Sequence, residues 1–122
     1  MTYAYDDRNV FAKILRGEIP NDTVLETEHS LAFRDIRPQA PTHVLVIPKG
    51  PYVCFDHFAL AASDAEITDY VRAVGQVCEI EGVAENGWRL IANAGRDGVQ
   101  EVPHLHVHVL AGRVLGRMLE RA

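Results

Sequence analysis

One long amphipathic stretch dominates the hydrophobic pattern of the chain, between Ser63 and Gly82. Ser63 and Glu66 form the Ser-x-x-Glu pattern of a capping box, which marks the start of a helix, and Gly82 supplies a stop. The apolar residues between them recur at the three- and four-residue spacing of one helix face: Ile67, Tyr70, Val71, Val74, Val77 and Cys78. The pattern predicts one long helix.

A second, shorter helix is predicted near the start of the chain, in the segment NVFAKILRGEIP. Asn9 is a suitable N-cap, and Gly17 supplies the stop. Between them, Val10, Phe11 and Ile14 share one face at helical spacing. The segment therefore has the ordered signals of one short helix.

Five segments have the composition of β-strands, because apolar and β-branched residues run between turn residues. They cover residues 23–28, 30–36, 43–49, 87–93 and 104–112. Pro38 and Pro41 make residues 37–41 a loop, since proline lacks the amide that a central strand uses. Strands that cluster without regular alternation with helices favour an α+β fold with an antiparallel sheet over a doubly wound parallel sheet.

Length and charge narrow the class of protein. A chain of 122 residues, 48% hydrophobic and 24% charged, is long enough for one domain with its own core. Its net charge of −5 argues against a protein that coats nucleic acid and allows a small phosphorylated ligand. The first residues lack the pattern of a signal peptide, and no apolar run is long enough to span a bilayer. We therefore expect a cytoplasmic location, with no nucleic-acid or membrane partner.

The stretch HLHVH carries three of the six histidines of the chain at alternate positions. In a strand, His104, His106 and His108 would lie on one face and the intervening apolar side chains on the other. Three interpretations compete: a solvated strand face, a metal site completed by His43 or a carboxylate, and a nucleophilic histidine that attacks an acyl or phosphoryl group. Spacing alone does not separate the last two.

The neighbouring loop favours an anionic ligand. The sequence NAGRDGVQEVP combines glycines, which let a backbone approach phosphate closely, with the neutral donors Asn93 and Gln100. Asp35, at the end of a predicted strand, fits either a turn that its carboxylate stabilises or two hydrogen bonds to a ribose diol. Together these residues fit a nucleoside phosphate better than a cation.

The sequence HLHVHVL has the pattern His-φ-His-φ-His-φ-φ, with φ apolar, and resembles the motif that names the histidine triad (HIT) superfamily. The segments VFAKILRGEIP, AFRDIRPQAPTHVLVIPK and GVQEVPHLHVHVLAGR are similar to its Hint branch, the histidine triad nucleotide-binding proteins, in the same order and at similar spacing. The resemblance covers roughly residues 9–119. We therefore expect a single HIT domain over residues 1–122, with a core over about 9–112 and a C-terminal tail over 113–122.

The resemblance implies a hydrolase or transferase that works through a covalent nucleotidyl-histidine. His106 matches the nucleophile of the family. His104 and His108 match the flanking histidines that orient it and meet the phosphate, and His43 matches a further histidine near the triad. This branch needs no metal for turnover, so neither a metal nor a cofactor is expected.

The resemblance also implies the nucleotide contacts. Asp35 and Ile36 match residues that hold the ribose and the base. The residues matched to the phosphate side are Asn93, Val99, Gln100, Glu101, His106 and His108. Glu101 stands in a loop typical of bacterial relatives, at a position where well-studied eukaryotic members carry serine. Because an ionised carboxylate repels phosphate, its side chain either points away or leaves the contact to its backbone amide.

The function that fits best is hydrolysis of a purine nucleoside 5′-phosphoramidate, such as adenosine 5′-phosphoramidate, to the nucleoside monophosphate. The alternatives are hydrolysis of a dinucleoside polyphosphate and a non-catalytic module that binds a nucleotide or zinc. The implied fold is an α+β antiparallel sheet of about five strands with one long and one short helix. In the family this sheet pairs with a second copy, so a homodimer is expected.

Overall fold

The computed structural model describes residues 3–120 of the chain. Within them the elements are, in order, α1 (Val10–Leu15), β1 (Thr23–Glu26), β2 (Ser30–Arg34), β3 (Thr42–Pro48), α2 (Phe55–Ala61), α3 (Asp64–Glu81), β4 (Trp88–Ala92) and β5 (Val107–Ala111). The strands form one five-stranded sheet in the order β1-β2-β3-β5-β4, with every neighbouring pair antiparallel. The expected α+β class is confirmed.

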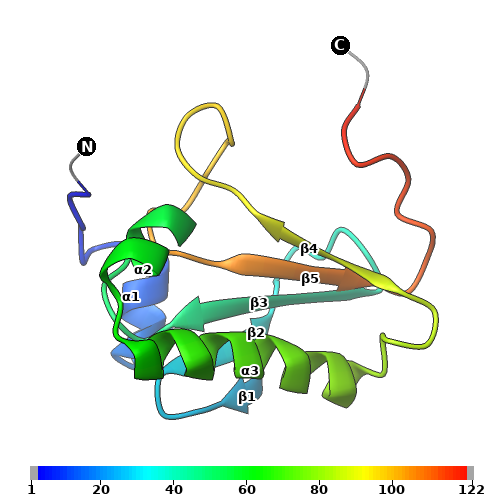
Figure 1. Cartoon of the computed structure of the whole chain (residues 1–122), viewed down its shortest axis with the longest axis horizontal. Helices are drawn as coiled ribbons and strands as arrows, with labels where there is room; N and C mark the ends of the chain where they lie inside the picture. Colours follow the sequence, from blue (N-terminus) through cyan, green and yellow to red (C-terminus); the bar gives the residue numbers. More distant parts are fainter. Residues whose placement is uncertain (1–2, 121–122) are drawn as a thin grey trace.

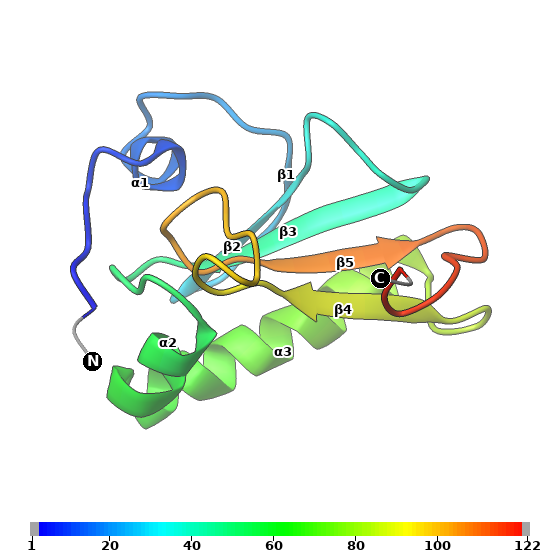
Figure 2. The same cartoon turned by 90° about the horizontal axis from the view of Figure 1, so that it is seen from above.

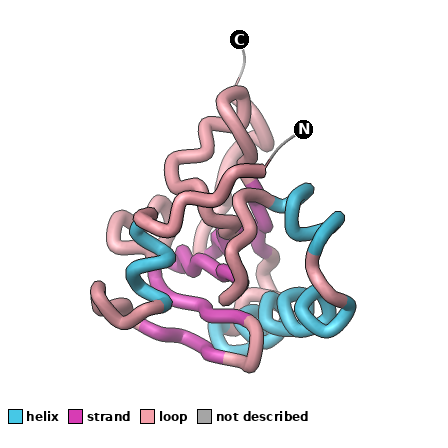
Figure 3. Tube along the Cα trace, turned by 90° about the vertical axis from the view of Figure 1, so that its left-hand side faces the viewer, coloured by secondary structure: helices cyan, strands magenta, loops and turns pink. Residues whose placement is uncertain are grey.

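The sheet has a helix on each side (Figures 1 and 2). α3 runs along one face and packs against β1, β2 and β3. α1 lies on the opposite side of the sheet from α3, as the end-on view in Figure 3 also shows. There it completes a smaller core made of Phe11, Leu31, Phe33, Leu45 and Ile47. Alternate residues of β2 and β3 therefore supply two separate cores.

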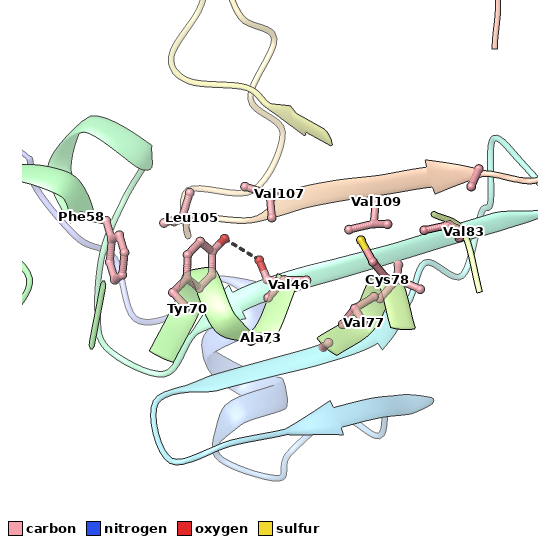
Figure 4. Packing of buried hydrophobic residues seen from close by; sticks show 13 residues of the cluster. Val46, Phe58, Tyr70, Ala73, Val77, Cys78, Val83, Leu105, Val107 and Val109 are labelled. Atoms are coloured by element: carbon pink, nitrogen blue, oxygen red, sulfur yellow. Dashed lines mark hydrogen bonds between the residues drawn. The ribbon is translucent and has the colours of Figure 1, made fainter. Parts of the chain in front are cut away.

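The larger core fills the space between α3 and the sheet (Figure 4). Leu105, Val107 and Val109 reach it from β5 and the segment just before it. The buried hydroxyl of Tyr70, on α3, donates to the Val46 carbonyl at 2.7 Å, so this polar group is satisfied within the core. Leu105 and Val107, the apolar residues between the histidines, are therefore part of this core.

The predicted start and stop signals of the two helices are also confirmed. The Ser63 hydroxyl accepts the Glu66 amide and the Glu66 carboxylate accepts the Ser63 amide, each at 3.1 Å. Gly82 ends α3 with φ of 64°, a left-handed conformation that glycine adopts without strain. Asn9 accepts the Ala12 amide at 2.9 Å and so caps α1. Within residues 3–120, no helix combines the length and apolar composition needed to cross a membrane.

The expectation of only two helices is wrong, because α2 was not predicted. α2 has seven residues, which are too few to display a helical period, and its N-cap residue Cys54 makes no capping bond through its side chain. Phe58 of α2 is buried against the rings of Tyr52 and Tyr70, each with its centroid 5.0 Å away. Tertiary packing therefore supports this helix more than its local sequence does.

The strand predicted over residues 104–112 is also shorter than expected, because β5 begins at Val107. Before that residue, the Leu105 amide donates to the Tyr52 carbonyl at 2.8 Å instead of joining the ladder with β3. His104 and His106 therefore precede the strand, and strand alternation alone does not set their positions. The first two strands likewise end earlier than predicted.

Candidate active site

The four candidate histidines come together on and beside the strands β3 and β5. His43 lies in β3, His108 lies in β5, and His104 and His106 immediately precede β5. The β3 residue that pairs with His108 belongs to the smaller core, so the site lies on the α1 side of the sheet. Phe11 of α1 meets the ring of His106 edge-on, with the two centroids 4.9 Å apart. The fold therefore brings His43 next to the three histidines of the HLHVH stretch.

The hydrogen bonding of His106 fixes which ring nitrogen carries its proton. Nδ1 lies 2.8 Å from the backbone carbonyl oxygen of His104. Because a carbonyl only accepts, Nδ1 of His106 donates, and Nε2 of the neutral ring keeps its lone pair. Nε2 has no hydrogen-bond partner among residues 3–120. The lone pair is therefore available for attack on an electrophile.

His43 and His108 form a hydrogen-bonded pair whose direction is also fixed. The Gln39 amide donates to His43 Nδ1 at 3.0 Å, so this nitrogen holds a lone pair and the proton lies on Nε2. His43 Nε2 then donates to His108 Nδ1 at 2.9 Å. In a neutral His108 the remaining proton is on Nε2. The pair therefore presents one N–H donor, next to the His106 ring, whose centroid lies 5.1 Å from that of His108.

The ring of His104 is bonded within the protein at both of its nitrogens. Its side chain is fully buried, its Nε2 lies 2.8 Å from the Pro48 carbonyl, and its Nδ1 lies 2.6 Å from the Tyr5 hydroxyl. Both ring nitrogens are used inside the protein, so neither is free to meet a phosphate. His104 orients His106 through its backbone carbonyl. The carbonyl contact fits the expected orienting role, and both nitrogens of the ring are bonded within the protein.

Burial keeps all four rings neutral near pH 7. It lowers the pKa of His43, against the opposing charge of Asp35, and lowers the pKa of His106, against the opposing hydrogen bond to the His104 carbonyl. It lowers the pKa of His104 and of His108 to about 4. A neutral imidazole is the form that has a nucleophilic lone pair. The site is therefore in its reactive protonation state at neutral pH.

Asp35 lies beside the histidine pair, just after β2. Its Oδ1 accepts the Arg37 amide at 2.8 Å, so the turn considered as one explanation is present. Its Oδ2 lies 3.5 Å from His43 Nε2, so the same carboxylate faces the pair. Each carboxylate oxygen accepts more than one hydrogen bond, which leaves acceptor capacity for a ligand hydroxyl. The side chain of Ile36 is 92% exposed and lies open to a ligand.

Gln100 shapes the loop that joins β4 to the histidines. Its Nε2 donates to the Val53 and Val102 carbonyls at 2.6 and 3.0 Å, and its Oε1 accepts the Gly95 amide at 3.1 Å. Its backbone amide also donates to the Gly95 carbonyl, at 3.0 Å. All of its donors are used within the protein. In this conformation Gln100 supports the loop and has no free donor for a phosphate.

The other three expected loop residues are brought to the same end of the sheet. Val99 is exposed and has φ of 55°, a left-handed conformation that strains a β-branched residue. Glu101 is exposed, and its charge raises the pKa of His106 against the larger effect of burial. Asn93 follows β4 directly, and its side chain makes no hydrogen bond to another described residue. Strain and free polar groups in one loop are typical of functional sites.

A metal site is the competing use of the same residues. Among residues 3–120, Asp35, His43 and His108 offer ligand atoms that all lie within 4.8 Å of one another. Two imidazole nitrogens bound to one tetrahedral zinc ion lie about 3.3 Å apart, and both must present lone pairs. The facing nitrogens of His43 and His108 are 2.9 Å apart and share a proton. The observed arrangement is that of a hydrogen-bonded pair, and zinc would require the rings to move.

Sequence reasoning missed the groups that orient the triad. Gln39 and Pro48 act through a backbone amide and a backbone carbonyl, which have no signature in the side-chain sequence. Tyr5 and Phe11 contact the triad from the N-terminal segment, about a hundred residues away along the chain. Phe11 was placed on the apolar face of the first helix, but nothing in the pattern indicated what that face covers.

The fold and the histidine cluster define a histidine triad protein. The HIT domain model matches residues 16–115. The chain is 60% identical to an HIT-like protein from Azospirillum brasilense, covering 99% of both chains. It is 43% identical to the purine nucleoside phosphoramidase of Escherichia coli (strain K12), covering 93% of this chain and 94% of that one. The chain belongs to the HIT family.

The solved structures agree with the sequence relatives. The fold matches that of a histidine triad protein from Clostridium difficile with a TM-score of 0.81 and 36% identity, over 95% of this chain and 100% of that chain. The predicted HIT fold is confirmed. Membership in this family of hydrolases supports a nucleotide hydrolase as the class of enzyme.

Proposed function

We propose that the protein hydrolyses purine nucleoside 5′-phosphoramidates to the nucleoside monophosphate and an amine. The observation that carries this proposal is the bond from His106 Nδ1 to the His104 carbonyl, which leaves Nε2 unprotonated in a buried, neutral ring. Relatedness to a purine nucleoside phosphoramidase supports the choice of substrate.

In the first chemical step, His106 Nε2 attacks the phosphorus atom and the P–N bond breaks. The leaving amine takes up one proton from the solvent, and the water that attacks in the second step returns one. A neighbouring histidine is suited to donate a hydrogen bond at the departing nitrogen. His108, whose Nδ1 is occupied by His43, directs its remaining N–H at the phosphate side. The His104 carbonyl holds the Nδ1 proton of His106 as the ring becomes positively charged. The product of this step is a nucleotidyl-histidine.

In the second step, water attacks the phosphorus atom of the adduct and releases the nucleoside monophosphate. The positively charged imidazole is a good leaving group, so the covalent route divides one difficult step into two easier ones. In this proposal, Asp35 holds the ribose hydroxyls and Ile36 contacts the base. Asn93 and the backbone at Val99 and Glu101 face the phosphate.

The direct test is to incubate the protein with adenosine 5′-phosphoramidate, with and without a chelator, beside His106→Ala. We expect AMP release that resists the chelator and falls at least about a thousandfold in the variant, as for loss of other catalytic nucleophiles. A radiolabelled nucleotide trapped on the wild-type protein by rapid acid quench, and absent from His106→Ala, would identify the adduct.

Other results of the same assay would favour the alternatives. Activity that disappears with the chelator would indicate that Asp35, His43 and His108 hold a metal. Cleavage of a diadenosine polyphosphate without cleavage of the amidate would indicate the polyphosphate hydrolase. A folded protein that turns over neither substrate would indicate a binding module.

We also propose that two copies pair through β4 and α3. β4 is an edge strand of the sheet. Leu90 pairs with a core residue of β5 yet is 47% exposed, because α3 packs chiefly on the other three strands. Val71 is likewise exposed on α3, where it lines an open groove along that helix. Apolar surface at an unpaired edge favours association. Light scattering should give a dimer mass for the wild type and a monomer mass for Leu90→Lys.

A further inference from the structure

The N-terminal segment contacts the histidine triad through Tyr5. The Tyr5 hydroxyl lies 2.6 Å from His104 Nδ1, and the two rings meet edge to face with centroids 5.6 Å apart. Tyr5 lies outside residues 16–115, the part of the chain that the HIT domain model matches. A residue outside the matched part of the chain therefore completes the hydrogen bonding of a triad histidine.

The direction of this hydrogen bond follows from the second partner of His104. The Pro48 carbonyl, 2.8 Å from His104 Nε2, only accepts, so Nε2 carries the proton. In the neutral ring, Nδ1 then holds a lone pair and needs a donor, which the Tyr5 hydroxyl supplies. Burial raises the pKa of Tyr5, so the hydroxyl keeps its proton. The ring is therefore held from both ends.

The same residue holds the nucleophile. The His104 carbonyl accepts the Nδ1 proton of His106 at 2.8 Å, so the placement of residue 104 decides where the His106 ring points. This bond strengthens when His106 becomes positively charged during attack. Displacement of this carbonyl therefore reduces the stabilisation of the transition state more than it reduces the affinity for substrate.

We propose that Tyr5 is a positioning residue of the active site, which fixes the His104 ring and, through the His104 carbonyl, the tautomer and direction of His106. Tyr5 does not touch the substrate. Only the expected effect of Tyr5 on turnover rests on the proposed function. The tautomer of His104 and the placement of His106 are properties of the free protein.

The test compares Tyr5→Phe with the matched control Tyr3→Phe. Tyr3 lies in the same segment, but its hydroxyl binds Asp56 and its ring stacks on His57 at 4.5 Å, so it does not contact the triad. For Tyr5→Phe we expect kcat on adenosine 5′-phosphoramidate to fall about three- to tenfold with KM within about twofold. Tyr3→Phe should leave both constants within about twofold of wild type. Equal constants for Tyr5→Phe and wild type would overturn the proposal.

Nitrogen-15 NMR of the histidine side chains gives a readout that does not depend on turnover. In the wild type, His104 should carry its proton on Nε2, with Nδ1 shifted by an accepted hydrogen bond. In Tyr5→Phe, Nδ1 of His104 should move toward the position of an unbonded ring nitrogen, and the His106 signals should move with it. A wild-type His104 protonated on Nδ1 would overturn the proposal without any variant.

The two readouts separate failure of this inference from failure of the proposed function. A wild type that is inactive on the amidate but gives the expected His104 and His106 signals would retain the positioning role and reject the substrate. A Tyr5→Phe protein with reduced kcat and unchanged His104 and His106 signals would reject the positioning role. Thermal unfolding of both variants confirms that the folded proteins are being compared.

Discussion

The two sides of the sheet are ordered by different physics. On the α3 side, Leu105, Val107 and Val109 are buried among apolar side chains, where contacts are many and no single partner is required. On the α1 side, each ring nitrogen of His43 and His104 has one specific hydrogen-bond partner. Residues adjacent in sequence therefore serve packing on one side and orientation on the other.

Burial on the two sides of the sheet has opposite effects on the free energy of folding. Burial of the apolar side chains stabilises the fold, by about 25 cal/mol for each Å² removed from water. Burial of the imidazoles disfavours their charged forms and makes each unpaired nitrogen costly. The buried histidines on the α1 side lower the stability of the fold, and the apolar core on the α3 side offsets that loss.

The largest expected effect separates neighbours on opposite sides. Leu105 is 1% exposed, so Leu105→Ala should lower the free energy of unfolding by about 2–5 kcal/mol. Well below its melting temperature the variant should keep most of its activity, whereas His106→Ala should lose activity with a smaller loss of stability. Urea denaturation and amidate hydrolysis measure the two quantities. A folded but inactive Leu105→Ala would mean that the two sides are coupled.

The next effect is a loss of stability in mild acid. Unfolded histidines have a pKa of about 6.5, whereas burial holds the folded values of His104 and His108 at about 4. Between these pH values the unfolded chain binds protons that the folded chain does not, so stability is complete above pH 6.5 and falls as the pH falls toward 4. Thermal unfolding across this range should show the decline. His104→Gln should show a shallower decline, and an identical slope would contradict the assignment.

A smaller effect concerns the ribose contact. Asp35→Ala should raise KM about tenfold and lower kcat much less, because a ribose contact stabilises ground and transition states alike. Steady-state kinetics on adenosine 5′-phosphoramidate measure the split. Asp35→Asn is the matched control for charge, since it keeps the size and one acceptor. A fall in kcat without a rise in KM would instead assign Asp35 to the His43 pair, 3.5 Å away.

The smallest effect concerns Glu101. Its carboxylate is exposed, so its repulsion of an anionic substrate is screened by salt. Glu101→Gln should lower KM about two- to threefold at low ionic strength, with no difference at high salt. A KM that stays the same at low ionic strength would mean that the side chain points away from the phosphate.

The α3 side of the molecule was predictable because packing leaves a period in the sequence. The capping box at Ser63 and the helical spacing after it predicted α3, and apolar and β-branched runs between turn residues predicted the strands. α2 escaped, since its support comes from the packing of Phe58 on rings elsewhere in the chain. The early end of the pairing before Val107 escaped for a similar reason, because the Leu105 amide binds the Tyr52 carbonyl.

The site was predictable in its members and not in their contacts. Spacing and family likeness brought out His104, His106 and His108, which the fold does assemble. They assigned the same kind of role to both flanking rings, whereas the structure buries His104 and leaves His108 partly open. That distinction depends on Tyr5 and on a backbone carbonyl, neither of which a linear motif contains.

The bond between His106 and the carbonyl of residue 104 affects which mutations can disable the site. In a serine protease, the group that orients the catalytic histidine is an aspartate side chain, and one nucleotide change can delete it. Here that group belongs to the main chain, and every amino acid at position 104 supplies a carbonyl. Mutation can remove the orienting group only by moving the backbone. Mutations that misplace the orienting carbonyl are therefore expected at the several residues that hold residue 104 in place.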